Sequence, residues 1–291
     1  MPANPVLLFT FAVTAAAVLL LWAPAVRGRR DWTWCTGLGL VCLAGLAAGY
    51  MDWRAPVGVA VYAALAWRAR EAQRPWLRGP LLVLTGLSAF LLALHRVPGF
   101  FNPVVAEGIV FSPGAAPVGL RLNLDTAVAG IVLTGVFCGP MRGADAWRAM
   151  LRRVWPVLLA TLVVVLGIGW GLGYVQPDLK WTAFSAFFLL SNLLITCVTE
   201  EAFFRGFLLA GFARVLGRWQ AGAAIALVLS AVLFGLAHVR GGLPLVLLAT
   251  IAGLFYGDAY QRTRRIEGAI LTHFALNAVH FVAFTYPALA G

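Results

Sequence analysis

The residues of this sequence that could do chemistry lie in otherwise apolar segments of its last third. They are Glu200, Glu201, Arg205, His238, Asp258, His273, Asn277 and His280. A carboxylate or an imidazole can act as a general base toward water, and imidazole and amide groups can donate hydrogen bonds to a developing oxyanion. A carboxylate, two histidines and an asparagine on three helices are therefore the parts of a hydrolytic site.

The two glutamates occur in the stretch CVTEEAFFRGFLLAGFAR, residues 197–214. On a regular α-helix Glu201 and Arg205 are four residues apart on one face, which favours an ion pair. Glu200 points about 100° away from that pair, and a purely structural role does not account for it. We therefore expect Glu201 to neutralise Arg205 and Glu200 to be the catalytic carboxylate.

The histidines belong to two further segments. His238 ends the apolar stretch LFGLAHV, where a single histidine is by itself more typical of a core residue. In LTHFALNAVH, the residues His273, Asn277 and His280 stand at positions i, i+4 and i+7, so they form one polar stripe on an apolar helix. Such a stripe must face the interior of a bundle, a cavity or a partner.

Asp258 and His280 have plainer explanations. Asp258 is one helical turn from Arg262, so an ion pair between them is expected. His280 is expected to line the same cavity as His273, without a catalytic role.

The composition indicates that membrane helices position these residues. Of the 291 residues, 62% are hydrophobic and only 11% are charged, and the mean hydropathy is +0.88. This is too little charge to cover the surface of a soluble domain. Several apolar runs are long enough to span a bilayer, whereas the alternation typical of an outer-membrane barrel is absent. We predict an all-α, polytopic membrane helical bundle of about 8–10 transmembrane helices.

About ten apolar segments carry this prediction. No Lys or Arg precedes the first segment, so we read it as a retained span rather than a signal peptide. The segments are residues 6–26, 32–50, 55–67, 79–94, 124–138, 154–175, 181–199, 220–238, 243–261 and 268–288.

Arginines concentrate in alternate loops between these segments. The positive-inside rule then predicts that the odd-numbered loops are cytoplasmic and that both termini lie outside. This topology accounts for the net charge of +11 without a nucleic-acid partner. The odd-numbered loops hold Arg27, Arg29, Arg30, Arg68, Arg70, Arg74, Arg78, Arg142, Arg148, Arg152, Arg153, Arg214, Arg218, Arg262, Arg264 and Arg265, and the even-numbered loops hold only Arg54, Arg96, Arg121, Lys180 and Arg240.

The longest polar interruption, residues 95–123, contains four prolines and is expected to be an irregular outer loop. It separates an N-terminal module of four spans plus this loop, residues 1–123, from a C-terminal domain at residues 124–291. No internal repeat is evident, which disfavours an inverted-repeat transporter. The four cysteines lie in apolar runs without CxxC spacing and are expected to be core residues.

Three short motifs of the C-terminal domain carry a resemblance to a known family. EEAFFR fits EExxxR, FGLAH fits FxxxH and HFALN fits HxxxN. Their order and approximate spacing resemble those of the CPBP family of intramembrane proteases, which includes the type II CAAX prenyl endopeptidases and bacteriocin-processing relatives. The resemblance covers roughly residues 180–285.

The resemblance implies a role for each motif residue. Glu200 resembles the catalytic glutamate of the family, which activates water together with His238. His273 and Asn277 resemble the pair that orients water or stabilises the tetrahedral oxyanion. Glu201 and Arg205 complete the first motif and are expected to support the others.

A catalytic metal is left open by these residues. Glu200, His238 and His273 could ligate zinc and leave one position for water. However, the sequence has no HExxH pair on a single helix. Because Glu200 could serve as a general base alone, we favour a metal-free site with no cofactor.

Hydropathy alone places two of these residues far apart. If residues 200–219 and 262–267 are cytoplasmic loops, His238 falls at the outer end of its helix and His273 near the inner end of its own. The two ends of a spanning helix are about 30 Å apart, which is too far for one site. We therefore expect the helix at 181–199 to continue through residue 213, with Glu200 at mid-depth.

The sequence therefore predicts an intramembrane endopeptidase in which Glu200 activates water to hydrolyse a peptide bond in a membrane-associated peptide or protein. Two alternatives remain, namely a non-catalytic membrane scaffold or immunity factor on the same fold, and a proton-coupled transporter. The expected partners are the substrate and the lipid bilayer. The expected location is the bacterial cytoplasmic (inner) membrane.

Overall fold

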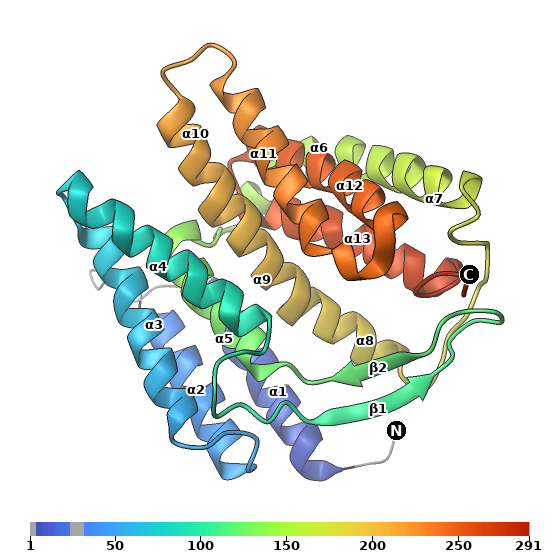
Figure 1. Ribbon diagram of the computed structural model, residues 1–291, viewed down its shortest axis with the longest axis horizontal. Coiled ribbons are helices and arrows are strands. Elements are labelled where there is room, and N and C mark those ends of the chain that lie inside the picture. Colours follow the sequence, from blue (N-terminus) through green and yellow to red (C-terminus); the bar gives the residue numbers. More distant parts are fainter. Residues whose placement is uncertain (1–3, 24–31, 291) are drawn as a thin grey trace. The chain divides into compact units, whose positions relative to one another are not determined.

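The computed structural model describes residues 4–23 and 32–290, and most of them are helical (Figure 1). The all-α prediction is confirmed. Arg27, Arg29 and Arg30 of the first basic loop lie outside the described residues. Contacts divide the chain into unit 1, which is Met1–Val105, Leu120–Arg142 and Leu194–Phe203, and unit 2, which is Ala106–Gly119, Gly143–Leu193 and Phe204–Gly291. The division expected after residue 123 stays a prediction.

Unit 1 is built from apolar helices that pack around α5. The side chain of Asn4 accepts hydrogen bonds from the first turn of α1, and Pro75 begins α4. The helices are α1 (Pro5–Leu19) with a short continuation η1 (Leu20–Trp22), α2 (Thr33–Ala47), α3 (Arg54–Glu71), α4 (Pro75–Ala93), α5 (Leu124–Leu133) with its π-helical end η2 (Thr134–Cys138), and α9 (Val198–Glu201).

Helix α5 forms the core of unit 1. Every residue from Ala127 to Leu133 is buried, because this helix is apolar on all its faces. It contacts α1, α2, α3, α4 and α9. The hydroxyl of Tyr62, on α3, donates a hydrogen bond of 3.2 Å to the backbone oxygen of Ala129.

A buried carboxylate fixes the first turn of α5. Asp125 accepts hydrogen bonds from the amide of Asn102 at 2.9 Å and from the backbone of Thr126 at 2.8 Å. Its other oxygen lies 2.8 Å from Nδ1 of His95. A buried carboxylate requires partners of this kind, so the beginning of the outer loop and the start of α5 are joined.

Helices α5 and α9 approach each other closely at Gly130. A Cβ atom at this position would lie 3.1 Å from Cα of Thr199, so only glycine fits. The hydroxyl of Thr199 donates a hydrogen bond of 2.9 Å to the backbone oxygen of Thr126. This contact fixes α9 at the residue that directly precedes Glu200.

Unit 2 contains the remaining helices and most of the outer hairpin. Helix α12 packs against α11, α13 and α6. The elements are α6 (Ala144–Thr161), η3 (Leu162–Leu166), α7 (Gly167–Gly171), α8 (Ser185–Ser191), α10 (Ala210–Leu216), α11 (Gly222–Ala237), η6 (Val239–Gly241), α12 (Gly242–Thr263) and α13 (Ile266–Ala283).

Six helical stretches among the described residues are long and apolar enough to cross a membrane. Three shorter apolar helices, of 10–17 residues, accompany them. The chain is therefore an integral, multi-pass membrane protein. The six are Pro5–Trp22, Pro75–Ala93, Ala144–Gly171, Ser185–Leu216, Val239–Thr263 and Ile266–Ala283.

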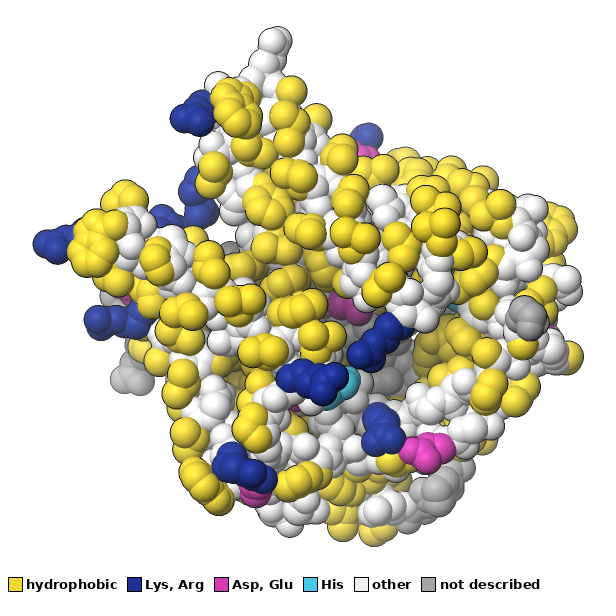
Figure 2. Space-filling view, viewed as in Figure 1, with side chains coloured by type: hydrophobic (Ala, Val, Ile, Leu, Met, Phe, Trp, Pro, Cys, Tyr) yellow, Lys and Arg dark blue, Asp and Glu magenta, His cyan; other side chains and the backbone are white. Residues whose placement is uncertain are grey.

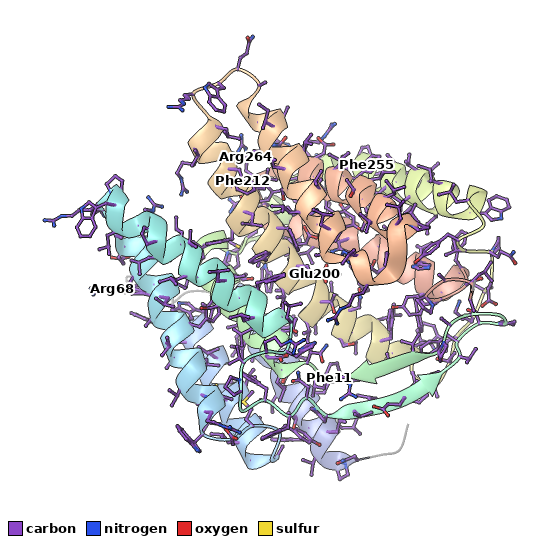
Figure 3. The ribbon with its side chains drawn as sticks, in the orientation of Figure 1. Phe11, Arg68, Glu200, Phe212, Phe255 and Arg264 are labelled. Carbon is purple, nitrogen blue, oxygen red and sulfur yellow. The ribbon has the colours of Figure 1, made fainter. Side chains whose placement is uncertain are left out.

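One continuous helix of 32 residues, Ser185–Leu216, carries both glutamates. The expected continuation beyond residue 199 is confirmed, and Figure 3 labels Glu200 about midway along this helix. The helix is interrupted by two π-helical segments, η4 (Asn192–Cys197) and η5 (Ala202–Leu209), on either side of α9. In these segments each N–H bonds to the carbonyl five residues earlier, which widens the turn.

The outer loop at 95–123 is more regular than expected. Strands β1 (Val104–Ile109) and β2 (Val118–Arg121) pair in a two-stranded sheet. Pro103 and Pro117 directly precede the two strands, and Pro113 lies in the connection between them. The prolines therefore delimit the strands instead of making the whole loop irregular.

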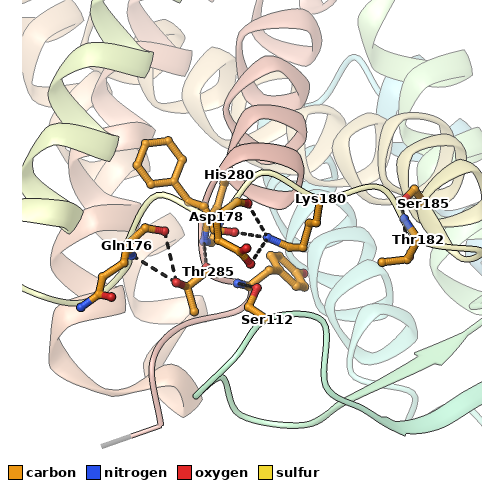
Figure 4. A network of polar contacts seen from close by, with 10 residues as sticks. Ser112, Gln176, Asp178, Lys180, Thr182, Ser185, His280 and Thr285 are labelled. Carbon is orange, nitrogen blue, oxygen red and sulfur yellow. Dashed lines mark hydrogen bonds and ion pairs between the residues drawn. The ribbon is translucent and has the colours of Figure 1, made fainter.

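A polar clasp joins residues 176–180 to residues 282–285 within unit 2 (Figure 4). Backbone hydrogen bonds of 2.8 Å run from Asp178 to Ala283, from Lys180 to Val282 and from Thr285 to Gln176. The ammonium of Lys180 also donates to the Asp178 carboxylate and to the Phe284 carbonyl. The clasp fixes the segment that follows α13.

The charge of Asp178 is expected to stabilise this clasp. The hydroxyl of Ser112 and the ammonium of Lys180 lower the pKa of Asp178 below its ordinary value. The stabilisation is present above the ordinary pKa of about 3.9 and is lost as the pH falls through the lower folded-state pKa. At pH 7 we expect the Asp178→Asn variant to unfold about 2 °C below the wild type, and the difference to vanish in strong acid.

Thermal unfolding of the detergent-solubilised protein across the acidic range measures this difference. Asp145→Asn is the matched control, because the Asp145 side chain is almost fully exposed and pairs with Arg148, three residues later on α6. A difference for Asp178→Asn that grows toward low pH would contradict the assignment.

Candidate active site

A buried arginine lies at the centre of the aromatic core of unit 2. Arg205 has no exposed surface, and its guanidinium donates a hydrogen bond of 3.0 Å to the backbone oxygen of Gly253. Its Cζ atom lies 4.6 Å from the ring centroid of Phe234 and 5.2 Å from that of Tyr256. The two rings therefore contribute cation–π interactions, so helices α11 and α12 both help to hold the charge.

His273 packs on the same two rings. Its imidazole stacks on Tyr256 with centroids 4.6 Å apart, and it meets Phe234 edge-on at 5.7 Å. The side chain is buried in the middle of α13. The imidazole is thus held in one orientation by aromatic contacts from α11 and α12.

His238 is oriented by the helix that it ends. Nδ1 of His238 lies 2.8 Å from the backbone oxygen of Phe234, one turn earlier on α11. A carbonyl oxygen only accepts, so Nδ1 carries a proton, and in the neutral form of the ring Nε2 keeps its lone pair. Nε2 is therefore the nitrogen that can accept a proton from water.

The separation of His238 and His273 expected from hydropathy is wrong. Their ring centroids lie 4.8 Å and 5.7 Å from that of Phe234, so both histidines flank one side chain. Helix α11 has only 16 residues and ends at His238, and His273 lies near the middle of α13, not at its end. Hydropathy therefore placed at opposite ends of spanning helices two residues that contact the same side chain.

Asn277 has an amide partner that the sequence did not indicate. Its Nδ2 donates a hydrogen bond of 3.2 Å to Oδ1 of Asn192, at the end of α8. One turn of α13 separates Asn277 from His273, as the polar stripe predicted. The signal for Asn192 was present as an amide side chain in an apolar run, although it matches none of the three motifs.

The two glutamates belong to unit 1 and differ in burial. Glu201 has no exposed surface, whereas Glu200 is partly exposed. The π-helical segment η5 begins directly after them, so the face relation assumed for Glu201 and Arg205 on a regular α-helix does not apply. The ion pair between these two residues stays a prediction.

Asp258 and His280 have structural partners. The carboxylate of Asp258 pairs with Arg262 at 2.7 Å, which confirms the expected ion pair. His280 donates from Nε2 to the backbone oxygen of Thr285 at 3.1 Å, because that carbonyl can only accept. His280 thus contacts the clasped C-terminal segment.

The described residues contain no group of three or more His, Cys, Asp and Glu side chains placed to hold a metal ion. Whether zinc takes part stays open, as the sequence left it. All four cysteines remain thiols, and Cys197 is the buried one.

The fold and these contacts define a multi-pass helical membrane protein with an oriented imidazole pair beside a buried arginine. Such a core suits proton transfer and hydrogen bonding to a developing charge. Residues 181–279 match the family model described as Type II CAAX prenyl endopeptidase Rce1-like. The resemblance seen in the three motifs is thereby confirmed, and this segment is similar to an endopeptidase family. Comparisons with curated proteins and with solved structures gave no match.

Proposed function

We propose that this protein is an intramembrane endopeptidase that hydrolyses a peptide bond in a membrane-associated peptide or protein. One observation carries the proposal, namely the packing of Arg205, His238 and His273 on the single ring of Phe234 within the segment that matches the endopeptidase family. The same segment contains Glu200 and Asn277. We also propose the bacterial cytoplasmic membrane as its location.

The proposed roles follow from the chemistry of each group. Glu200 accepts a proton from water, and the resulting hydroxide attacks the carbonyl carbon of the scissile bond. The Nε2 lone pair of His238 accepts a hydrogen bond from the same water. His273 and Asn277 donate hydrogen bonds to the oxyanion, and the proton on Glu200 then passes to the leaving amine.

Glu201 and Arg205 support this site without touching the substrate. Arg205 is fully buried and is held by Gly253, Phe234 and Tyr256, so it organises the core from which His238 and His273 project. Zinc enters no step of the proposed reaction, because Glu200 can serve as the general base alone.

The name of the matched family refers to prenylated CAAX substrates. For this protein we propose only the reaction class, which is hydrolysis of a peptide bond in a substrate reached from the membrane or its cytoplasmic face. The experiment below identifies the sequence that is cut.

The test compares protein N-termini and membrane peptides, by mass spectrometry, in host cells that make the wild type or the Glu200→Ala variant at equal abundance. We expect a defined set of new termini that is present only with the wild type. Two identical profiles, together with a phenotype on deletion of the whole protein, would refute the protease. A scaffold, an immunity factor or a proton-coupled transporter would then take its place.

Asn192 gives a separate prediction under this function. Removing its side chain takes away an acceptor that fixes the Asn277 amide, so the oxyanion donor becomes less well oriented. We expect Asn192→Ala to lower kcat about tenfold with little change in KM. Asn192→Asp keeps the acceptor oxygen and is expected to recover part of the loss, whereas equal rates for wild type and Asn192→Ala would contradict this role.

A further inference from the structure

A cavity of about 540 Å³ lies in unit 2 at the opposite end of α11 from His238. It is formed where α10 ends, α11 begins and α12 ends. None of the proposed catalytic residues lines it. On the topology predicted from the arginine distribution, this end of unit 2 faces the cytoplasm.

The lining of the cavity divides into an apolar part and a polar part. The apolar part consists of aliphatic side chains, most of them small, which leave room between the helices: Leu209, Ala210, Ala213 and Ala223. The polar part contains two guanidinium groups together with amide and aromatic side chains. These polar residues are Arg214, Gln220, Gln261 and Arg264, with Trp219 and Tyr260.

The two lining arginines carry an uncompensated charge. No Asp or Glu occurs among the described residues that line the cavity. The nearest acid along α12, Asp258, is paired with Arg262 through a hydrogen bond of 2.7 Å. The cavity is therefore electropositive, and an anion would be favoured there.

The backbone holds the lining in place. Arg264 ends α12 in the left-handed conformation, with φ of 54°, and its N–H donates to the Tyr260 oxygen at 2.7 Å. The amide of Gln261 donates to the Ala223 oxygen at 2.9 Å, which joins the end of α12 to the start of α11. Figure 3 labels Arg264 beside Phe212, which belongs to α10.

Exposed apolar side chains surround this basic region. Val215 and Trp219 are exposed at the end of α10 and in the turn to α11, and Figure 2 shows Lys and Arg side chains beside apolar ones there. Tryptophan, tyrosine and arginine together are typical of the level of lipid headgroups at a membrane surface.

We propose that this cavity binds an anionic phospholipid, with its phosphate between Arg214 and Arg264 and the upper part of an acyl chain against Leu209, Ala210 and Ala213. Arginine binds phosphate through paired N–H donors, and basic pockets between membrane helices on the cytoplasmic side bind acidic headgroups. The volume is in the range of small-molecule sites and would hold a headgroup with its first methylene groups.

Native mass spectrometry of the full-length protein in neutral detergent tests the proposal. The protein is titrated with phosphatidylglycerol and with phosphatidylcholine that carry the same acyl chains. We expect preferential retention of phosphatidylglycerol, and about fivefold weaker binding for each of Arg214→Gln and Arg264→Gln. Arg152→Gln removes an exposed arginine of α6 that does not line the cavity, and it is expected to bind as the wild type does.

A second variant distinguishes binding inside the cavity from nonspecific attraction by positive charge. Ala213→Phe fills the apolar part without changing the charge, and it is expected to weaken phosphatidylglycerol binding as well. Equal loss in Arg152→Gln, or unchanged binding in Ala213→Phe, would overturn the proposal. Displacement of the lipid by millimolar inorganic phosphate would also overturn it in favour of a simple anion site.

The readout is independent of the proposed protease activity. Glu200→Gln is expected to bind phosphatidylglycerol as the wild type does, because Glu200 does not line the cavity. Loss of hydrolysis and loss of lipid binding are therefore separate results.

Discussion

Replacing Glu200 by glutamine is expected to slow peptide-bond hydrolysis about 10³-fold while the protein unfolds at nearly the same temperature as the wild type. Glutamine keeps the size of the side chain and its ability to hydrogen bond, but it cannot accept a proton from water near neutral pH. The partly exposed position of Glu200 near the middle of the helix Ser185–Leu216 makes this substitution compatible with the fold.

Initial rates of the purified protein on a peptide that spans an identified cleavage site measure the effect. Glu107→Gln, at an exposed position of β1, removes the same charge outside the proposed site and serves as the control. Glu200→Asp keeps a carboxylate and is expected to retain more activity than Glu200→Gln. A Glu200→Gln protein with a normal rate would show that another group activates the water.

Arg205→Lys is expected to destabilise the protein by about 3 kcal/mol, although the charge is conserved. A lysine cannot place a planar guanidinium over Phe234 and Tyr256 while also donating to the Gly253 oxygen. The buried lysine ammonium would then lack compensating contacts, and the Gly253 carbonyl would lose its hydrogen-bond donor. The cost is large because Arg205 has no exposed surface.

Thermal unfolding in detergent measures this loss. Arg153→Lys, at an exposed position of α6, is the matched control and is expected to change little. Arg205→Met fills a similar volume without a charge, so comparison of the two variants separates the cost of the buried charge from the cost of lost packing. An Arg205→Lys protein as stable as the wild type would show that the aromatic contacts contribute little.

The sequence was most informative about the residues that cost the most to bury. Polar side chains in an apolar chain stand out, so Arg205, His238 and His273 were identified before their common contact with Phe234 was known. The helical periodicity also predicted the stripe of His273 and Asn277. Both results follow from local spacing on a helix, which the sequence states directly.

Boundaries were predicted less well, for a physical reason. Hydropathy assigns Glu200, Glu201 and Arg205 to a loop because it scores charges as solvent-exposed, whereas Glu201 and Arg205 are fully buried. The end of α11 was predicted well by contrast, since the segment expected at 220–238 ends one residue after this helix does.

Contacts between distant parts of the chain were beyond the sequence. Nothing in residues 176–180 or 282–285 marks them as backbone partners, yet they pair in the clasp. Asn192 looked like an isolated amide until its contact with Asn277 was seen. The carbonyl of Gly253 that receives the Arg205 guanidinium carries no side-chain signal at all.

The π-helical segment at Ala202–Leu209 has a consequence for insertions and deletions. A π turn is what an α-helix forms when it must accommodate an extra residue without breaking. Deleting one residue there would let the segment return to α-helical hydrogen bonding while the glutamates keep their orientation relative to α10. The π-helical segment therefore tolerates the engineered loss of one apolar residue, whereas the same deletion in a regular α-helical turn would rotate Glu200 by about 100° relative to α10.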